Sequence, residues 1–374
     1  MLKACTNDAK SPEKVKTETI CSQAPEVDHL ISVLIAILAA FVVVVIFMPG
    51  AIKMLREAGM TGIDVHKPEK PEIPKGGGFI VLFAIVFGLL LVMGITTFQE
   101  QAEVREGLLA ALVSILMAGL IGLFDDTFDF KTSTKIVLPM VASIPMVAMS
   151  VGNPTMSIPF IGTINFGPFY ALIIVPLMMT FIVDSTNMYG GMNGLEAGLS
   201  SINSSAIILY VLLSPYVDGH EVTTAQMDAG LVAAALLGAS IAFLIFNRFP
   251  AKVLPGDVGR LPIGAAMASA LILGNMDRLA IVMYMPFLLN FLLYIVYRLY
   301  VKRKGIEYVK FASPREDGTL EVIGPFTMYW ILPHFSKRIS EKRNVLLLLL
   351  LQALLAYGAV TFLLIVYPLG VGVF

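Results

Sequence analysis

Long, uninterrupted runs of apolar side chains recur along the whole of this 374-residue chain. A run of about 20 apolar residues is long enough to cross the hydrocarbon layer of a bilayer as a helix. Hydrophobic residues make up 57% of the sequence and charged residues only 14%, a composition outside that of soluble domains. The sequence therefore predicts an all-α, polytopic membrane protein.

Ten apolar runs are predicted to be transmembrane helices. They cover residues 30–48, 79–98, 107–124, 136–151, 169–183, 193–214, 228–246, 261–275, 279–298 and 344–367. Three of these spans, at 136–151, 169–183 and 261–275, are short, and we expect every boundary to err by several residues. The spans form one ten-helix domain over residues 30–374, preceded by a polar tail over residues 1–29.

The distribution of Lys and Arg predicts the orientation, because cytoplasmic loops retain positive charge. Most of the 26 basic residues fall in alternate loops. These loops are predicted to be cytoplasmic and cover residues 49–78, 125–135, 184–192, 247–260 and 298–343. Both termini are then outside. Gly and Pro punctuate an alternating pattern at 155–167, which predicts a short external hairpin.

The N-terminal tail contains no apolar core of a cleaved signal peptide before residue 30, so the first span is expected to direct its own insertion. Cys5 and Cys21 both lie in this tail. The sequence is compatible with two alternatives: a disulfide, if the compartment is oxidising, and two unpaired cysteines. The net charge of −1 indicates no nucleic-acid partner.

Three carboxylates, those of Asp125, Asp126 and Asp129, stand at the end of an apolar run. Acidic groups where a helix leaves lipid are costly, and they repel one another, so a cation is their expected companion. If the helix continues, Asp125 and Asp129 share one face, as do Lys131 and Lys135.

A second polar string runs from Asp184 to Glu196 and contains Asn187 and Asn193. Each amide must find a partner in a medium without water, which favours a cavity with a polar ligand. Interhelical amide hydrogen bonds that serve packing are the alternative.

Two further inner loops contain residues suited to anions or metals. Asp257 stands between Gly256 and Gly259, where its carboxylate can reach a metal with little steric hindrance, although a turn aspartate is equally compatible. Gly76, Gly77 and Gly78 precede a span and can either approach an anion or form a flexible helix entry.

These motifs, in this order and on one predicted face, resemble the polyprenyl-phosphate N-acetylhexosamine-1-phosphate transferase family. The motifs are the aspartate pair, Asn187 to Glu196, and Asn247 to Asp257. The resemblance covers about residues 60 to 345 and implies ten helices, outside termini and a cytoplasmic active site. Gly190 to Glu196 and the lone His334 look like the eukaryotic and archaeal branch that acts on dolichyl phosphate. That branch implies the endoplasmic reticulum in a eukaryote and the plasma membrane in a prokaryote.

The resemblance implies that a lipid phosphate attacks the sugar-linked phosphorus of UDP-N-acetylglucosamine and expels UMP, in the first membrane step of lipid-linked glycan assembly. Both reactants are anions, and two unit charges 4 Å apart repel by about 4 kcal/mol at an effective dielectric near 20. By resemblance, Asp257 and Asn187 would hold Mg²⁺, with Mn²⁺ as the alternative. Lys135 would add a fixed positive charge at the phosphates.

Roles for the other residues follow from the same resemblance. Asp125 or Asp126 would deprotonate or orient the lipid phosphate, and the alternative mechanism forms a covalent phospho-aspartate. Asn193 would bind the uracil and Asn247 would line the same pocket. His334 is expected to be structural. The remaining predicted substrate contacts are Asp129, Lys67, Lys310, Arg315 and Glu196.

Three alternatives concern function and assembly. An ion-coupled transporter would use intramembrane carboxylates as a cation site at the bilayer midplane. Here the carboxylates gather at one face and the two halves show no repeat, so the enzyme is favoured. A family member that uses another UDP-N-acetylhexosamine and a homodimeric assembly are both open.

Overall fold

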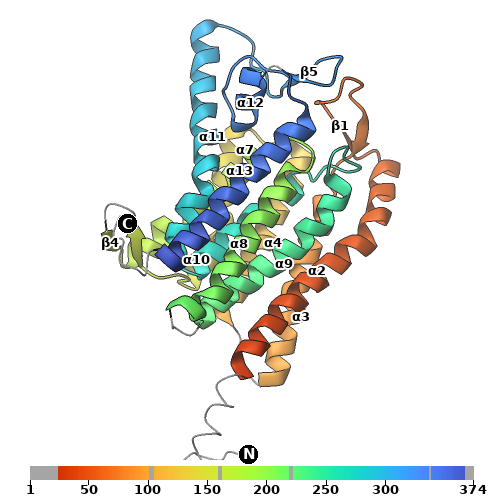
Figure 1. Ribbon diagram of the computed structural model, residues 1–374. Coiled ribbons are helices and arrows are strands. Elements are labelled where there is room, and N and C mark those ends of the chain that lie inside the picture. Colours follow the sequence, from red (N-terminus) through yellow and green to blue (C-terminus); the bar gives the residue numbers. More distant parts are fainter. Residues whose placement is uncertain (1–23, 101–104, 159–161, 219–221, 337, 367–374) are drawn as a thin grey trace, which may run out of the picture.

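The protein is a bundle of long helices that lie alongside one another (Figure 1). The computed structural model describes residues 24–100, 105–158, 162–218, 222–336 and 338–366. Cys5 and Cys21 lie outside the described residues. The prediction of an all-α, polytopic membrane protein is confirmed.

Eight helical segments among the described residues are long and apolar enough to span a membrane. They contain α2 (Ala24–Glu57), α3 (Gly78–Glu100), α4 (Glu106–Phe128), the π-helical turn η1 (Tyr170–Ile174) with α7 (Val175–Tyr189), α8 (Leu195–Asp218), α9 (Thr224–Asn247), α11 (Asp277–Lys304), and α13 (Glu341–Thr361) with η2 (Phe362–Val366). Each coincides with a predicted span.

The other two predicted spans are shorter helices. The span at 136–151 is divided at Ser143 into α5 (Thr132–Ala142) and α6 (Ile144–Ala148), because Pro145 lacks an N–H and restricts the residue before it. The span at 261–275 is α10 (Asp257–Leu273), a helix of 17 residues. The count of ten and the orientation of the termini stay predictions.

Several predicted loops are shorter than expected, because the helices continue beyond the apolar runs. Residues 49–57 belong to α2, 125–128 to α4, 184–189 to α7 and 298–304 to α11. Hydropathy marks where a chain leaves lipid, whereas a helix with polar residues continues until its own end signal. The acidic and amide residues of the site therefore lie mostly on rigid helix ends.

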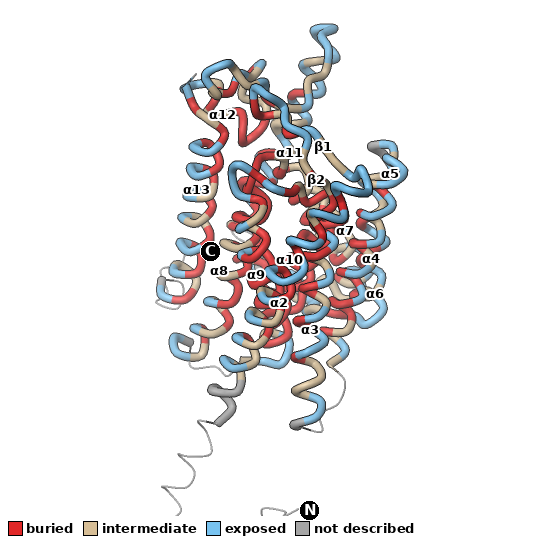
Figure 2. Tube along the Cα trace, turned by 90° about the vertical axis from the view of Figure 1, so that its right-hand side faces the viewer, coloured by how far each residue is buried: buried red, intermediate tan, exposed pale blue. Residues whose placement is uncertain are grey.

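Helix α10 lies at the centre of the bundle and packs against α3, α4, α7 and α9. Apart from Asp257 and Arg260, every residue of α10 is buried, as expected for a helix that is apolar on all sides. Figure 2 shows the buried residues gathered in the middle of the bundle. Large apolar side chains on the outside, which face lipid, include Phe47, Phe83, Leu292 and Leu346.

Glycines let the neighbouring helices approach α10 closely. A Cβ atom at Gly122 of α4 would lie 2.2 Å from the carbonyl oxygen of Asp257. A Cβ atom at Gly78 of α3 would lie 2.2 Å from the Cα atom of Gly259. These contacts place the first turn of α10 directly against α3 and α4.

In the part of the chain that the structure describes, three small antiparallel hairpins accompany the helices: β1 (Thr61–Ile63) with β2 (Glu72–Pro74), β3 (Thr155–Ile158) with β4 (Gly162–Asn165), and β5 (Ser313–Pro314) with β6 (Leu320–Glu321). The hairpin predicted at 155–167 is confirmed as β3–β4, and its external location stays a prediction. The loops with β1 and β5 and the short helix α12 (Met328–Ser336) lie at the same end of the bundle (Figure 1).

We predict that Gly122→Ala destabilises the protein by about 1–3 kcal/mol, because the new methyl group collides with the backbone of α10. Gly94→Ala is the matched control, since no heavy atom lies within 4 Å of a Cβ atom there. Thermal unfolding in detergent measures both. A melting temperature for Gly122→Ala at or above that of Gly94→Ala would contradict the packing argument.

Candidate functional site

Asp125 occupies the last turn of α4 and is held by Lys135 of α5. The Lys135 Nζ atom lies 2.9 Å from Asp125 Oδ1 and 3.1 Å from Asp129 Oδ1. The backbone N–H of Phe130 also donates to Asp125 Oδ1, at 3.0 Å. Partial burial lowers the pKa of Lys135, but the hydrogen bonds to the two aspartates outweigh it and the net shift is upward. Lys135 is therefore a fixed cation at the end of α4.

Asp126 fixes the start of α10. Its Oδ2 accepts a hydrogen bond from the backbone N–H of Val258 at 2.9 Å, and its Oδ1 lies 2.9 Å from Lys75 Nζ. Gly256 has a φ of +71°, and a Cβ atom there would lie 2.6 Å from Asp126 Oδ2. Any side chain at Gly256 would thus be both strained and in collision with the carboxylate.

Asp257, the first residue of α10, meets Asp125. Burial raises the pKa of Asp257, the Arg260 guanidinium opposes this, and a hydrogen bond with Asp125 raises it further. Two carboxylates in direct contact need a shared proton or a cation. Asp125 and Asp257 therefore converge as the sequence predicts.

Asn187 lies in the last turn of α7, which packs against α10. The end of α7 lies near the start of α10, because Glu196 Oε1 contacts both the N–H of Gly191 and the Arg260 guanidinium. A Cβ atom at Gly264 of α10 would lie 2.7 Å from the Cα atom of Val183. Asn187 is one helical turn beyond Val183, towards the end where α10 begins. This packing places Asn187 beside the first turn of α10.

Arg260 is a member of this site that the sequence analysis missed. Its Nη2 atom lies 2.8 Å from Glu196 Oε1, which also accepts the backbone N–H of Gly191 at 2.8 Å. Its Nη1 atom lies 3.9 Å from Asp257 Oδ1. The spacing of three residues between Asp257 and Arg260 is the signal that could have found it, because such residues share a helix face.

The long loop between α11 and α13 brings Lys310 to the same place. Burial lowers the pKa of Lys310, and so do the nearby cations Arg260 and Lys135, whereas Asp257 acts in the opposite direction. Arg315 belongs to the β5–β6 hairpin, where its Nε atom lies 3.5 Å from Glu321 Oε2.

We call the convergent set the aspartate cluster: Asp125, Asp126, Asp129, Asp257, Glu196, Lys75, Lys135, Arg260 and Lys310.

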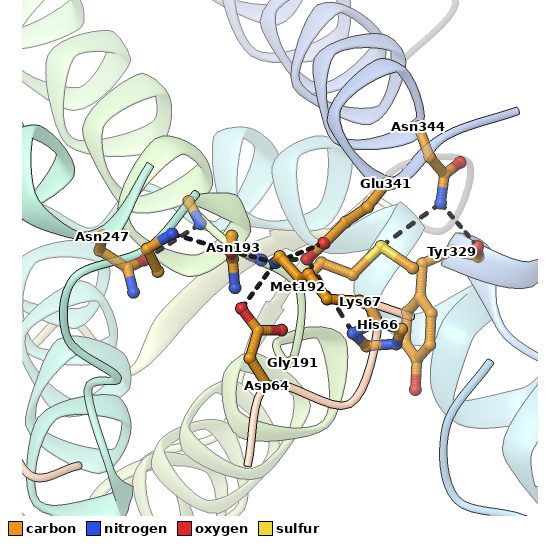
Figure 3. A network of polar contacts seen from close by, with 12 residues as sticks. Asp64, His66, Lys67, Gly191, Met192, Asn193, Asn247, Tyr329, Glu341 and Asn344 are labelled. Carbon is orange, nitrogen blue, oxygen red and sulfur yellow. Dashed lines mark hydrogen bonds and ion pairs between the residues drawn. The ribbon is translucent and has the colours of Figure 1, made fainter. Parts of the chain in front are cut away.

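A second buried set of polar residues surrounds Lys67 (Figure 3). The Lys67 Nζ atom lies 2.6 Å from Asp64 Oδ2 and 2.7 Å from Glu341 Oε2. It also donates a hydrogen bond to Asn193 Oδ1 and lies 4.6 Å from the centre of the Phe249 ring. This Lys67 network, Asp64, His66, Lys67, Asn193 and Glu341, joins the loop between β1 and β2 to the start of α13.

Both predicted pocket asparagines make hydrogen bonds between loops. Asn193 Oδ1 accepts the N–H of Ala251 at 2.9 Å, and the Asn193 N–H donates to Glu341 Oε1 at 2.8 Å. Asn247 accepts the N–H of Gly194 at 3.1 Å and donates to the carbonyl of Val253 at 2.8 Å. The α7–α8 and α9–α10 loops are therefore held together by side-chain amides.

The Lys67 network contains a triad with the spacing of metal ligands. Ligand atoms of Asp64, His66 and Glu341, all buried, lie within 4.8 Å of one another and could hold a metal ion. The Lys67 ammonium already contacts both carboxylates, so its charge occupies the position that a metal would need. Burial lowers the pKa of His66 to about 4, although Asp64 opposes the shift, so the imidazole is neutral at pH 7.

The fold and these two clusters define a polytopic membrane protein with a charged site at one end of its helix bundle. The family model for glycosyl transferase family 4 matches residues 108–275. A protein of Saccharolobus solfataricus, provisionally named UDP-N-acetylglucosamine–dolichyl-phosphate N-acetylglucosaminephosphotransferase, is 34% identical over 76% of this chain and 83% of its own length. The chain belongs to glycosyl transferase family 4.

Two more distant relatives have related names. The UDP-N-acetylglucosamine–dolichyl-phosphate N-acetylglucosaminephosphotransferase of Dictyostelium discoideum is 27% identical over 66% of this chain and 67% of its own length. The phospho-N-acetylmuramoyl-pentapeptide-transferase of Limosilactobacillus reuteri is 27% identical over 66% of this chain and 76% of its own length. Similarity thus extends to both branches, and identity is higher to the archaeal protein.

We predict that His66 makes the fold sensitive to acid. Its pKa is about 4 in the folded protein and about 6.5 in the unfolded chain, so the unfolded state binds the proton first. Stability is then lost as the pH falls from 6.5 towards 4, by about 2 kcal/mol at pH 5. The drop in melting temperature from pH 7 to pH 5 should be smaller in His66→Phe than in the wild type.

The matched control for this prediction is His334→Phe, because His334 lies outside the Lys67 network. It should retain the wild-type drop. An equal drop in His66→Phe would show that His66 is not the group responsible.

Proposed function

We propose that this protein transfers N-acetylglucosamine-1-phosphate from UDP-N-acetylglucosamine to a polyprenyl phosphate such as dolichyl phosphate, with release of UMP. The observation that carries the proposal is the aspartate cluster, in which carboxylates and cations from α4, α5, α8, α10 and three loops converge at one end of the bundle. The names of the relatives support the choice of donor and acceptor.

The charge balance of the aspartate cluster supports a divalent metal. Its five carboxylates face four cations, so it cannot by itself neutralise a nucleotide diphosphate and a lipid phosphate. Asp257 and Asn187 offer the oxygen ligands that Mg²⁺ prefers, with the other positions left to waters and phosphate oxygens. When bound, Mg²⁺ would neutralise the developing charge on the phosphates.

The contacts of the two adjacent aspartates favour different roles for them. Both oxygens of Asp126 are held, by Lys75 and by the N–H of Val258, so we assign it to positioning α10. Asp125 contacts both Lys135 and Asp257. We assign Asp125 to orienting and deprotonating the acceptor phosphate beside Lys135, with direct transfer to phosphorus.

On the donor side, Asn193 would bind the uracil through its amide nitrogen, since its oxygen is already used by Lys67 and Ala251. Lys67 and Asn247 would then act by holding the Asn193–Gly194 turn. Lys310, Arg315 and Glu196 would line the path of the diphosphate and sugar, with Asp129 beside Lys135 at the acceptor side.

An apolar groove on the outside of the bundle suits the acceptor chain. It has a volume of about 470 Å³ and lies between α5–α6 and η1–α7. Its lining includes Val137, Val141, Ile173 and Leu177, which are exposed on the membrane-facing side. Val137 lies near the start of α5, as does Lys135. A polyprenyl chain in the groove would therefore bring its phosphate to the N-terminal end of α5.

The transporter alternative gains no support from the fold. Asp125 and Asp126 lie in the last turn of α4 and Asp257 is the first residue of α10, whereas a carrier would place its carboxylates at mid-depth. Purified protein in vesicles should therefore show no donor or cation flux.

We predict that UMP release from UDP-N-acetylglucosamine requires dolichyl phosphate and a divalent cation, and that EDTA abolishes it. Asp257→Ala should lower kcat at least about a thousandfold with the fold intact, because the metal site loses its carboxylate. Glu57→Gln, at an exposed ion pair of α2, is the control. Wild-type turnover in Asp257→Ala would refute the metal assignment, and a donor panel would reveal another sugar.

A second prediction addresses the groove. Val141→Trp should fill it and raise the KM for long-chain polyprenyl phosphate about tenfold or more, because the chain loses apolar contact. Turnover with a short, water-soluble prenyl phosphate should not change. Leu288→Trp, at a lipid-exposed position of α11, is the matched control. Equal effects of Val141→Trp on long and short acceptors would place the chain elsewhere.

A further inference from the structure

Arg260 holds an unusual position in the most deeply packed helix. Asp257 and Arg260 are the two residues of α10 that are not buried, and they lie one turn apart on the same face. About 23% of the Arg260 side chain is exposed. The face of α10 that opens onto the aspartate cluster therefore presents one carboxylate and one guanidinium.

The guanidinium of Arg260 is only partly satisfied. Nη2 contacts Glu196 at 2.8 Å, but Nη1 is 3.9 Å from Asp257, too far for a hydrogen bond. Nε is buried and has no hydrogen-bond partner among the described residues. A buried donor without a partner costs free energy, and a planar fork of free N–H groups matches a phosphate.

The surroundings of Arg260 indicate that an anion belongs there. Lys310 lies close enough to Lys135 and to Arg260 for both positive charges to repel its ammonium group. Three cations that face one another repel unless anions lie between them. Carboxylates lie beside two of these cations: Asp257 and Glu196 beside Arg260, and Asp125 and Asp129 beside Lys135. They leave Nε of Arg260 without an acceptor, which the oxygens of a bound phosphate would supply.

We propose that Arg260 is a further substrate-binding residue that contacts the diphosphate of the donor. This inference rests on the proposed function. Lys135 contacts Asp125 and Asp129, which we assign to the acceptor side. Arg260 instead contacts Glu196, which bonds Gly191 in the turn that leads to Asn193. Arg260 therefore lies between the uracil position and Asp257, where a diphosphate must pass.

A purely structural role for Arg260 predicts a different pattern of ligand binding. If Arg260 only joins α10 to Glu196 of α8, its loss would loosen the site and weaken every nucleoside ligand alike. If it binds the diphosphate, its loss would weaken ligands that carry phosphates and spare uridine. Binding of UDP and of uridine therefore separates the two roles without any turnover.

The experiment measures binding of UDP and of uridine to the full-length protein with Mg²⁺ and without acceptor. Arg260→Gln should weaken UDP about 10- to 100-fold, as expected for loss of charge-assisted hydrogen bonds, and leave uridine unchanged. Arg260→Lys, which keeps the charge but not the planar fork, should weaken UDP by a smaller factor. Arg56→Gln, at the exposed end of α2, is the matched control.

Equal weakening of UDP and uridine, or wild-type affinity for both, would overturn the assignment of Arg260. If Arg260→Gln does not fold, unchanged UDP affinity in Arg260→Lys would overturn it. Failure of the wild-type protein to bind UDP would instead refute the proposed function, so the two failures are distinguishable.

Discussion

The close approach of α10 to its neighbours is the contact on which the site depends. Because Gly122 and Gly78 have no side chains, the backbone of α10 lies directly against α4 and α3. This contact brings Asp257 to Asp125 and lets Asp126 hold the N–H of Val258. A side chain at either glycine would separate the carboxylates that a metal would have to join.

Charge compensation is the second requirement, since acidic groups near lipid are costly unless they are paired. Each carboxylate of the aspartate cluster has a cation close by, such as Lys75 for Asp126 and Arg260 for Glu196. The Lys67 network meets the same requirement with one ammonium between Asp64 and Glu341. Two anionic substrates would disturb this balance, which is the physical reason to expect a divalent ion.

The two clusters are joined by a short segment of chain. Asn193 belongs to the Lys67 network and Glu196, three residues later, to the aspartate cluster. Phe311 makes a second link, because it packs against His66 and follows Lys310. The Lys67 network therefore adjoins the donor side of the site at two places, the α7–α8 connection and the loop that follows α11.

The sequence alone determined the class of the protein and the main acidic residues. Long apolar runs, and acidic residues at the ends of those runs, can be recognised without knowledge of the tertiary structure. It placed Asp125, Asp257 and Lys135 in one site through order and resemblance. Only the tertiary structure decided the partners: Lys75 for Asp126, Arg260 for Glu196, and Lys67 between two carboxylates. Such pairs are distant in sequence, and glycine-mediated packing, which has no hydropathic signal, brings them together.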